Sequence, residues 1–290
     1  MKQLIVNADD FGLTRGVNSG IVRAFEAGIV TSTTIMANGE AFENAVELAR
    51  ACPGLGVGCH LAIVGGQPVA SAVEVPSLVD ERGALPPTLT KLVIKLATGS
   101  VRSDDIEREF RAQVTRVINA GITPTHLDSH KHSHTHPTVM KALGRMAAEF
   151  NIPCVRNPFE AMFTARRTRG GSRAKTLAYL KQYVLSAATA PGAVRFRQIV
   201  REYGLRTPDF FFGVKLTGML DTGSIRSIMK DLPDGTSELM CHPAIHDDAL
   251  ENAHTRLKRE RERELEALTD PGLRRFAEQH GIELINFRGL

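Results

Sequence analysis

The residues best suited to chemistry lie in one short stretch of histidine and aspartate. They recur at every second position: His126, Asp128, His130, His132, His134 and His136. In an extended chain, residues two apart share one face, and imidazole nitrogens and carboxylate oxygens are ligands of divalent cations. The spacing predicts a metal site with one of these histidines as ligand, the others positioning it or meeting a substrate. A solvated, His-rich metal-storage tract is the alternative.

Further titratable side chains stand where other short apolar segments end. Those segments end at Asp9 and Asp10, at His60, at Arg156 and at His242. If the segments are parallel strands, their carboxyl ends share one rim, where sites are built in barrels of alternating strands and helices. A storage tract would not need carboxylates and imidazoles on neighbouring strands. The pattern therefore favours a catalytic metal site.

The adjacent pair Asp9 and Asp10 sets a geometric condition. Neighbouring residues of a regular strand face opposite ways, so both serve one site only if the strand has already ended. Phe11-Gly12 is the expected break. One carboxylate would then bind the metal while the other acts as a base, and a helix cap or turn is the structural alternative.

Short apolar segments alternate with amphipathic ones along the chain. We expect strands at residues 3–9, 31–37, 55–62, 124–130, 153–157, 210–215, 237–242 and 282–287. We expect helices at residues 16–27, 40–51, 104–120, 137–150, 222–230, 252–268 and 270–280. This order predicts an α/β fold, an irregular (β/α) TIM-like barrel of seven or eight parallel strands, complete or incomplete. A doubly wound sheet is less favoured because the chain has no glycine-rich nucleotide motif.

The chain is expected to form a single domain over residues 1–290. Two excursions, at about 64–103 and 158–209, interrupt the alternation. The mixed-sign run at 258–266 is interpreted as a solvated helix face. No apolar run is long enough to span a bilayer and no signal peptide is evident, so we expect a cytoplasmic protein. The four cysteines are widely spread without a C-x-x-C pair, which argues against disulfides and against zinc–thiolate coordination.

The segment 161–206 is strongly basic. It carries ten Lys or Arg residues against one acid, Glu202. The stretch from Thr176 to Ala190 has an apolar face at helical spacing, so this segment is a candidate for peripheral contact with the inner face of an anionic membrane. A helix packed on the barrel with solvated arginines is the alternative.

Several motifs resemble a known family. The chain contains N-A-D-D-F-G at 7–12, G-C-H-L at 58–61, H-L-D-S-H-K-H at 126–132 and C-H-P at 241–243. Together they resemble the YdjC-like carbohydrate deacetylases, the relatives of chitooligosaccharide deacetylase, over nearly the whole chain. The segments 75–80, 134–139 and 204–209 are more similar to the hopanoid-biosynthesis branch of that family.

This resemblance implies a deformed barrel that removes the N-acetyl group from an acetylated amino sugar with one divalent ion, Mg²⁺ or Zn²⁺. It implies Asp10, His60 and His130 as metal ligands, Asp9 as general base and His242 as proton donor. Arg156 is the candidate to orient Asp9. The remaining candidates for substrate contact are Asp128, His132 and His134.

Other functions stay open at this stage. The resemblance implies as substrate an N-acetylglucosamine-containing oligosaccharide or a glycolipid such as N-acetylglucosaminyl hopanoid. A phosphoesterase or amidohydrolase on a similar barrel is the first alternative, and a non-catalytic metal- or nucleic-acid-binding protein the second. We expect no nucleic-acid partner, and the oligomeric state is left open, a homodimer included.

Overall fold

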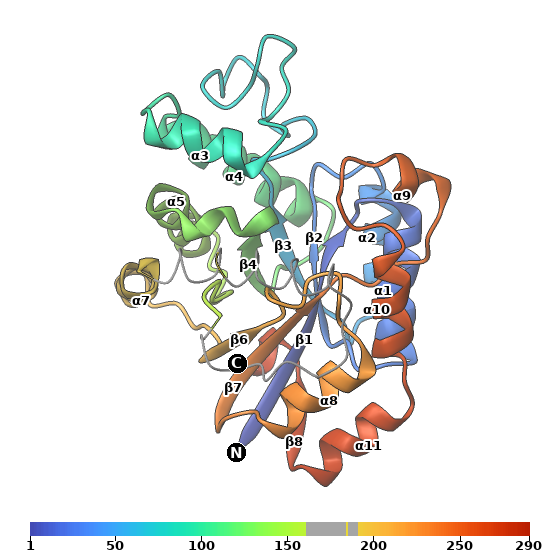
Figure 1. Cartoon of the computed structure of the whole chain (residues 1–290). Helices are drawn as coiled ribbons and strands as arrows, with labels where there is room; N and C mark the ends of the chain where they lie inside the picture. The colour runs from blue at the N-terminus through green and yellow to red at the C-terminus, as the bar shows by residue number, and fades with distance from the viewer. Residues whose placement is uncertain (161–183, 185–190) are drawn as a thin grey trace.

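The computed structural model describes residues 1–160, 184 and 191–290. Eight parallel strands form one sheet (Figure 1). They are β1 (Lys2–Phe11), β2 (Ser32–Ile35), β3 (Gly56–Leu61), β4 (His126–Ser129), β5 (Cys154–Val155), β6 (Phe210–Phe212), β7 (Gly235–Cys241) and β8 (Ile282–Ile285). Each lies within or overlaps an expected strand, which confirms the α/β alternation predicted from the sequence.

The sheet does not close into a complete barrel. The strand order is β5-β4-β3-β2-β1-β7-β6, with β8 paired to β1. Between the two ends of this order, the described residues form only an isolated bridge, from Cys154 to Arg206. One edge of β1 is shared: β8 pairs with Lys2–Ile5, whereas β2 pairs with the segment from Asn7 onward. The described part of the chain therefore forms an incomplete barrel, which is one of the two forms expected from the sequence.

Helices follow most strands and cover the sheet (Figure 1). They are α1 (Arg15–Glu26), α2 (Phe42–Ala51), α3 (Leu89–Ala97), α4 (Ser103–Asn119), α5 (Pro137–Glu149), α7 (Gly192–Glu202), α8 (Thr222–Lys230), α9 (Asp248–Asn252), α10 (Glu260–Leu268) and α11 (Gly272–Gln279). Local signals fix several ends. Thr14 caps α1 by accepting from Val17 N, Pro137 opens α5, and Gly121 follows α4 with a φ of 77°.

The helix expected at 252–268 is wrong as a single element. The chain leaves the helix after Asn252 and starts α10 at Glu260. The Lys258 ammonium donates to the carbonyl oxygens of Leu250, Glu251 and Ala253 at 2.5, 2.7 and 2.7 Å. Carbonyl groups at the end of a helix lack most of their helical donors, so the lysine supplies hydrogen bonds where α9 ends.

The two excursions contain helices that the sequence reading did not single out, α3 and α7. The helix expected from Thr176 to Ala190, and most of the basic segment 161–206, lie outside the described residues. Membrane contact through this segment therefore stays a prediction. Within the described part of the chain, no helix is both long and apolar enough to cross a bilayer.

Candidate functional site

The Asp9–Asp10 pair lies on an irregular part of β1. The strand ends at Phe11, where the break at Phe11-Gly12 was expected, but it includes both aspartates, so this break does not explain how they face one site. Instead, the register with β2 shifts between Ala8 and Phe11, and Asp10 has a φ of 72°. A bulge with a left-handed residue turns consecutive side chains toward one face. Both carboxylates thereby line the same cavity.

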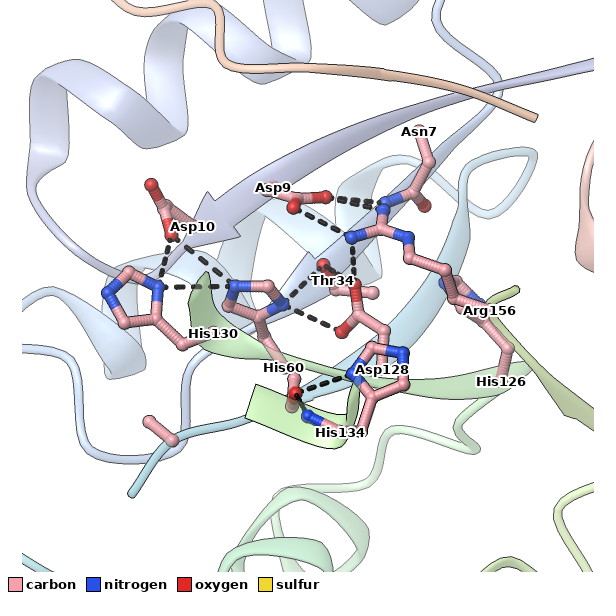
Figure 2. A network of polar contacts seen from close by, with 12 residues as sticks. Asn7, Asp9, Asp10, Thr34, His60, His126, Asp128, His130, His134 and Arg156 are labelled. Carbon is pink, nitrogen blue, oxygen red and sulfur yellow. Dashed lines mark hydrogen bonds and ion pairs between the residues drawn. The ribbon is translucent and has the colours of Figure 1, made fainter. Parts of the chain in front are cut away.

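Three side chains from three strand ends converge on one point (Figure 2). Asp10 Oδ1 lies 3.1 Å from His130 Nδ1 and 3.5 Å from His60 Nε2. The two imidazole nitrogens are 3.3 Å apart. Ligand atoms about 2.1 Å from a tetrahedral or octahedral ion are separated by about 3.0–3.4 Å. Asp10 Oδ1 is also buried without a hydrogen bond of good geometry. The three residues therefore fit a divalent ion.

The side chains behind these residues fix their orientation. Asp128 Oδ1 lies 2.7 Å from His60 Nδ1, so the other ring nitrogen of His60 faces Asp10. Burial alone would lower the pKa of His60, but Asp128, Asp9 and Asp10 raise it to about 9. A site with this negative field favours a cation. A carboxylate behind a ligand histidine is a common arrangement in metal sites.

Arg261 is a member of the site that sequence reasoning missed. Its Nη2 donates to Asp10 Oδ2 at 2.5 Å, which leaves Oδ1 facing the histidines. The interpretation of 258–266 as a solvated face is wrong at this residue and at Glu264, each 1% exposed. Both occupy the stripe of Leu257, Leu265 and Leu268 at helical spacing, a signal the sequence did contain.

Arg156 is completely buried and binds three carboxylates. Its Nη1 and Nη2 donate to Asp9 Oδ2 and Oδ1 at 2.8 and 2.6 Å. Nη1 also lies 2.6 Å from Asp128 Oδ2, and Nε donates to Glu238 Oε1 at 2.7 Å. The guanidinium thus fixes the plane of Asp9, in the geometry expected for an orienting role. Against the effect of burial, it also lowers the pKa of Asp9 well below its ordinary value.

Glu238, on β7, is the second residue that sequence reasoning missed. One guanidinium cannot neutralise three buried carboxylates. Burial, and after it the charge of Asp9, raise the pKa of Glu238 to about 8 against the opposing effect of Arg156. Glu238 is therefore protonated at neutral pH, while Asp9 is ionised. Its position inside an apolar strand gave no sequence signal of this role.

The extended backbone that would place every second histidine on one face ends at Ser129. Beyond it the chain enters a 3-10 turn (His130–Thr135), with Lys131 and His132 at positive φ. His130 and His132 line the cavity, whereas His126 stacks on Phe287. The pattern therefore does not form one continuous face.

The structure does not bring Asp128 or His134 to the cavity. Both are fully buried, and Asp128 lies behind His60. His134 Nδ1 lies 2.6 Å from Ser129 Oγ, beneath the turn. The expectation that these two residues contact the substrate is therefore wrong. Asp128 supports His60, and His134 supports the turn. His132 keeps a place on the cavity wall.

His242 lines the same cavity as the three converging residues. It follows β7, and its backbone N–H donates to Glu264 Oε2 at 2.6 Å. Burial is the main reason that its pKa falls to about 4, with Asp9 opposing the shift and Arg261 reinforcing it. The imidazole is therefore neutral at pH 7. The cavity it shares with Asp9 and Asp10 has a volume of about 470 Å³.

Fold and site together define an α/β protein with a one-carboxylate, two-imidazole site at the carboxyl end of a parallel sheet. The chain belongs to the YdjC-like protein family, whose sequence profile matches residues 3–279. The resemblance stated from the motifs is thus confirmed at the level of the family, without distinguishing its hopanoid branch.

Named relatives and a solved structure are similar to almost the whole chain. A carbohydrate deacetylase of Geobacillus stearothermophilus is 36% identical over 98% of this chain and 96% of its own. A chitooligosaccharide deacetylase of Salmonella typhimurium is 34% identical over 96% and 95%. A solved Enterococcus faecalis protein, described provisionally as a cellobiose-phosphate cleavage protein, superposes with a TM-score of 0.79 at 28% identity, covering 99% and 98% of the two chains.

Proposed function

We propose that this protein is a divalent-metal-dependent hydrolase that removes the N-acetyl group from an acetylated amino sugar. The observation that carries the proposal is the convergence of Asp10, His60 and His130 beside the oriented carboxylate of Asp9. The deacetylase names of relatives that cover nearly the whole chain support the same reaction.

The roles of the residues follow from their positions. A divalent ion held by Asp10, His60 and His130 would polarise the acetyl carbonyl and acidify a water molecule. Asp9 accepts the proton of the attacking water, and Arg156 holds Asp9 by both oxygens so that its carboxylate stays in plane. Because its pKa is depressed, Asp9 releases that proton readily.

The leaving nitrogen needs a proton before the C–N bond breaks. His242 lies on the same cavity and is neutral at pH 7, so it is free to take up the proton that Asp9 releases and to pass it to the nitrogen. His132, also on the wall, is the candidate for contact with the sugar.

An acetate-release screen tests the reaction class. Chitobiose, other N-acetylglucosaminides and N-acetylglucosaminyl hopanoid are offered to the protein loaded with Mg²⁺ or Zn²⁺. We expect acetate and a free amine in equal amounts from at least one substrate. Phosphate release from sugar phosphates, with no acetate from any acetylated sugar, would instead support a phosphoesterase and overturn the proposal.

Metal analysis of the same samples tests the ligand set. His130→Ala is expected to lose the bound ion and, with it, several kcal/mol of transition-state stabilisation, a fall in rate of at least about 10²-fold. The matched control is His280→Ala, because His280 is an exposed histidine at the end of α11. Equal metal content in wild type and His130→Ala would refute the ligand assignment.

A further inference from the structure

A second cavity lies at the opposite end of the same sheet. It has a volume of about 530 Å³ and is formed around the amino ends of β3, β4 and β5, where Val57, Thr125 and Pro153 line it. That volume is within the range of small-molecule sites, about 300–1,000 Å³. The metal-binding residues lie at the carboxyl ends of β1, β3 and β4, so the two cavities are separate.

The polar wall of this second cavity is made of arginines. Three of its lining residues, Arg50, Arg206 and Arg288, are cationic, and none is acidic. Within the described part of the chain, none of the three forms an ion pair with an Asp or Glu side chain, whereas Arg111 and Arg145 on α4 and α5 do. An arginine cluster without acidic partners creates a positive potential in a concave site.

Backbone carbonyls hold these guanidinium groups in place. Arg50 Nη2 donates to Ala120 O at 2.7 Å, where α4 ends. Arg288 donates to Pro53 O at 3.2 Å and to Leu55 O at 3.3 Å. Arg206 Nη1 donates to Leu290 O. Since a guanidinium has five N–H donors, Arg50 and Arg288 keep most of theirs for another acceptor.

The rest of the lining is mostly apolar. Leu55, Val57 and Ile122 are buried beneath it, whereas Ala49, Pro53 and Pro153 are the apolar lining residues with more exposed surface. A ligand that fits both walls carries an anionic group for the arginines and a compact apolar body for the rest. Planar, bidentate guanidinium groups are especially suited to phosphoryl oxygens.

We propose that this second cavity is a binding site for a small organic phosphate monoester, separate from the deacetylation site. Its ligand contacts Arg50 and Arg288 through the phosphoryl group, and through the organic group it contacts Ala49, Pro53 and Pro153, the more exposed of the apolar lining residues. The proposal does not depend on the reaction at the metal site, because none of these residues lines the first cavity.

Titration calorimetry with phenyl phosphate, inorganic phosphate and phenol tests the site on the full, metal-loaded chain. We expect phenyl phosphate to bind more tightly than inorganic phosphate, and phenol not to bind. In Arg50→Gln/Arg288→Gln the affinity for phenyl phosphate is expected to fall at least tenfold, with the single variant Arg50→Gln intermediate. Acetate release is expected to stay at the wild-type rate in these variants.

Two control variants test whether phenyl phosphate binds in the second cavity. Arg274→Gln alters an exposed arginine that likewise donates to a carbonyl, Phe25 O at 3.4 Å, outside both cavities. Arg256→Gln alters an arginine that lines the first cavity. Both are expected to keep the wild-type affinity within twofold. A loss of binding in Arg256→Gln but not in Arg50→Gln/Arg288→Gln, or no binding of phenyl phosphate to the wild type, would overturn the proposal.

Discussion

The arginines at the two ends of the parallel sheet differ in burial and in hydrogen-bond partners. At the carboxyl end, Arg156 and Arg261 are 0% and 1% exposed, and the guanidinium of Arg156 donates to the carboxylates of Asp9 and Glu238. At the amino end, Arg50 and Arg288 are exposed and donate to backbone carbonyls. Strand β3 joins the two ends, with Val57 in one cavity and His60 in the other.

This contrast separates structural from recognition roles for the same residue type. A buried arginine with carboxylate partners is part of the folded core, and removing it leaves buried negative charge without compensation. An exposed arginine with carbonyl partners adds little to stability and remains available to a ligand. Variants of the buried arginines should therefore change the stability of the fold, whereas variants of the exposed arginines should change ligand binding.

Asp9→Asn gives the largest expected effect. In the proposed mechanism, loss of the general base lowers turnover by about 10²–10⁴-fold, while the proposed ligands Asp10, His60 and His130 remain. We expect acetate release to fall by that factor with metal content unchanged. Asp104→Asn, at an exposed position on α4, is the matched control. Full activity in Asp9→Asn would remove Asp9 from the mechanism.

Arg156→Met tests the buried charge cluster through stability. Asp9, Asp128 and Glu238 would lose their shared partner, and we expect the free energy of unfolding to fall by about 3–5 kcal/mol. Arg111→Met breaks the surface pair with Glu149, in which the side chains are 43% and 41% exposed, and should cost at most about 1 kcal/mol. Denaturant titration of both variants measures the difference. Equal losses would show that burial does not distinguish the two pairs.

Arg261→Met is expected to act on metal affinity. Without its guanidinium, Asp10 Oδ2 is no longer held, so the carboxylate is free to rotate away from His60 and His130. Changes behind a metal ligand typically weaken binding by about 10–100-fold. Competition with a chelator measures the affinity independently of turnover. An unchanged affinity would mean that the bulge at Asp10 is sufficient to position the ligand.

Glu238→Gln is expected to change how stability depends on pH. The folded state keeps Glu238 protonated up to a pKa of about 8, whereas the unfolded chain releases the proton near its ordinary value of 4.5. The folded state therefore binds more protons between these values, and the contribution of Glu238 to stability falls as pH rises, by at most about 1.4 kcal/mol per pH unit. The variant should show a smaller fall between pH 5 and 8. Identical slopes would contradict protonation of this residue.

Arg50→Gln/Arg288→Gln gives the smallest expected effect on stability. Exposed residues away from special features change the free energy of unfolding by about 0.5 kcal/mol or less. Thermal unfolding without ligand should therefore match wild type closely. A large destabilisation would place these arginines among the structural ones and weaken the contrast between the two ends.

Much of the fold and the core of the site were predictable because their signals are local. Each strand is a short apolar run with turn residues beside it, and Asp10, His60 and His130 sit directly at strand ends. The bulge at Asp10 was not predictable in the same way, since a left-handed aspartate depends on its partners in the fold. The turn after Ser129 was not predictable either, because its sequence is equally compatible with an extended chain.

The long-range partners of the site were the least predictable. Glu238 becomes informative only once β7 lies beside β1, and Arg261 reaches Asp10 across 251 residues of sequence. No single stretch of sequence encodes such pairs. The buried position of Arg261 was nevertheless visible in its helical spacing with leucines, which a reading based on charge alone overlooks.

The shared edge of β1 has a consequence for how the chain acquires its fold. Residues Lys2–Ile5 pair with Ile282–Ile285, which follow them by 280 residues of sequence (Lys2 pairs with Ile282). Contacts of such high sequence separation slow folding and raise the contact order. During synthesis, β1, which carries Asp9 and Asp10, therefore cannot complete its pairing until Ile282–Ile285 have been added. In nascent chains stalled before residue 282, the backbone amides of Lys2–Ile5 that face β8 should be poorly protected from hydrogen exchange.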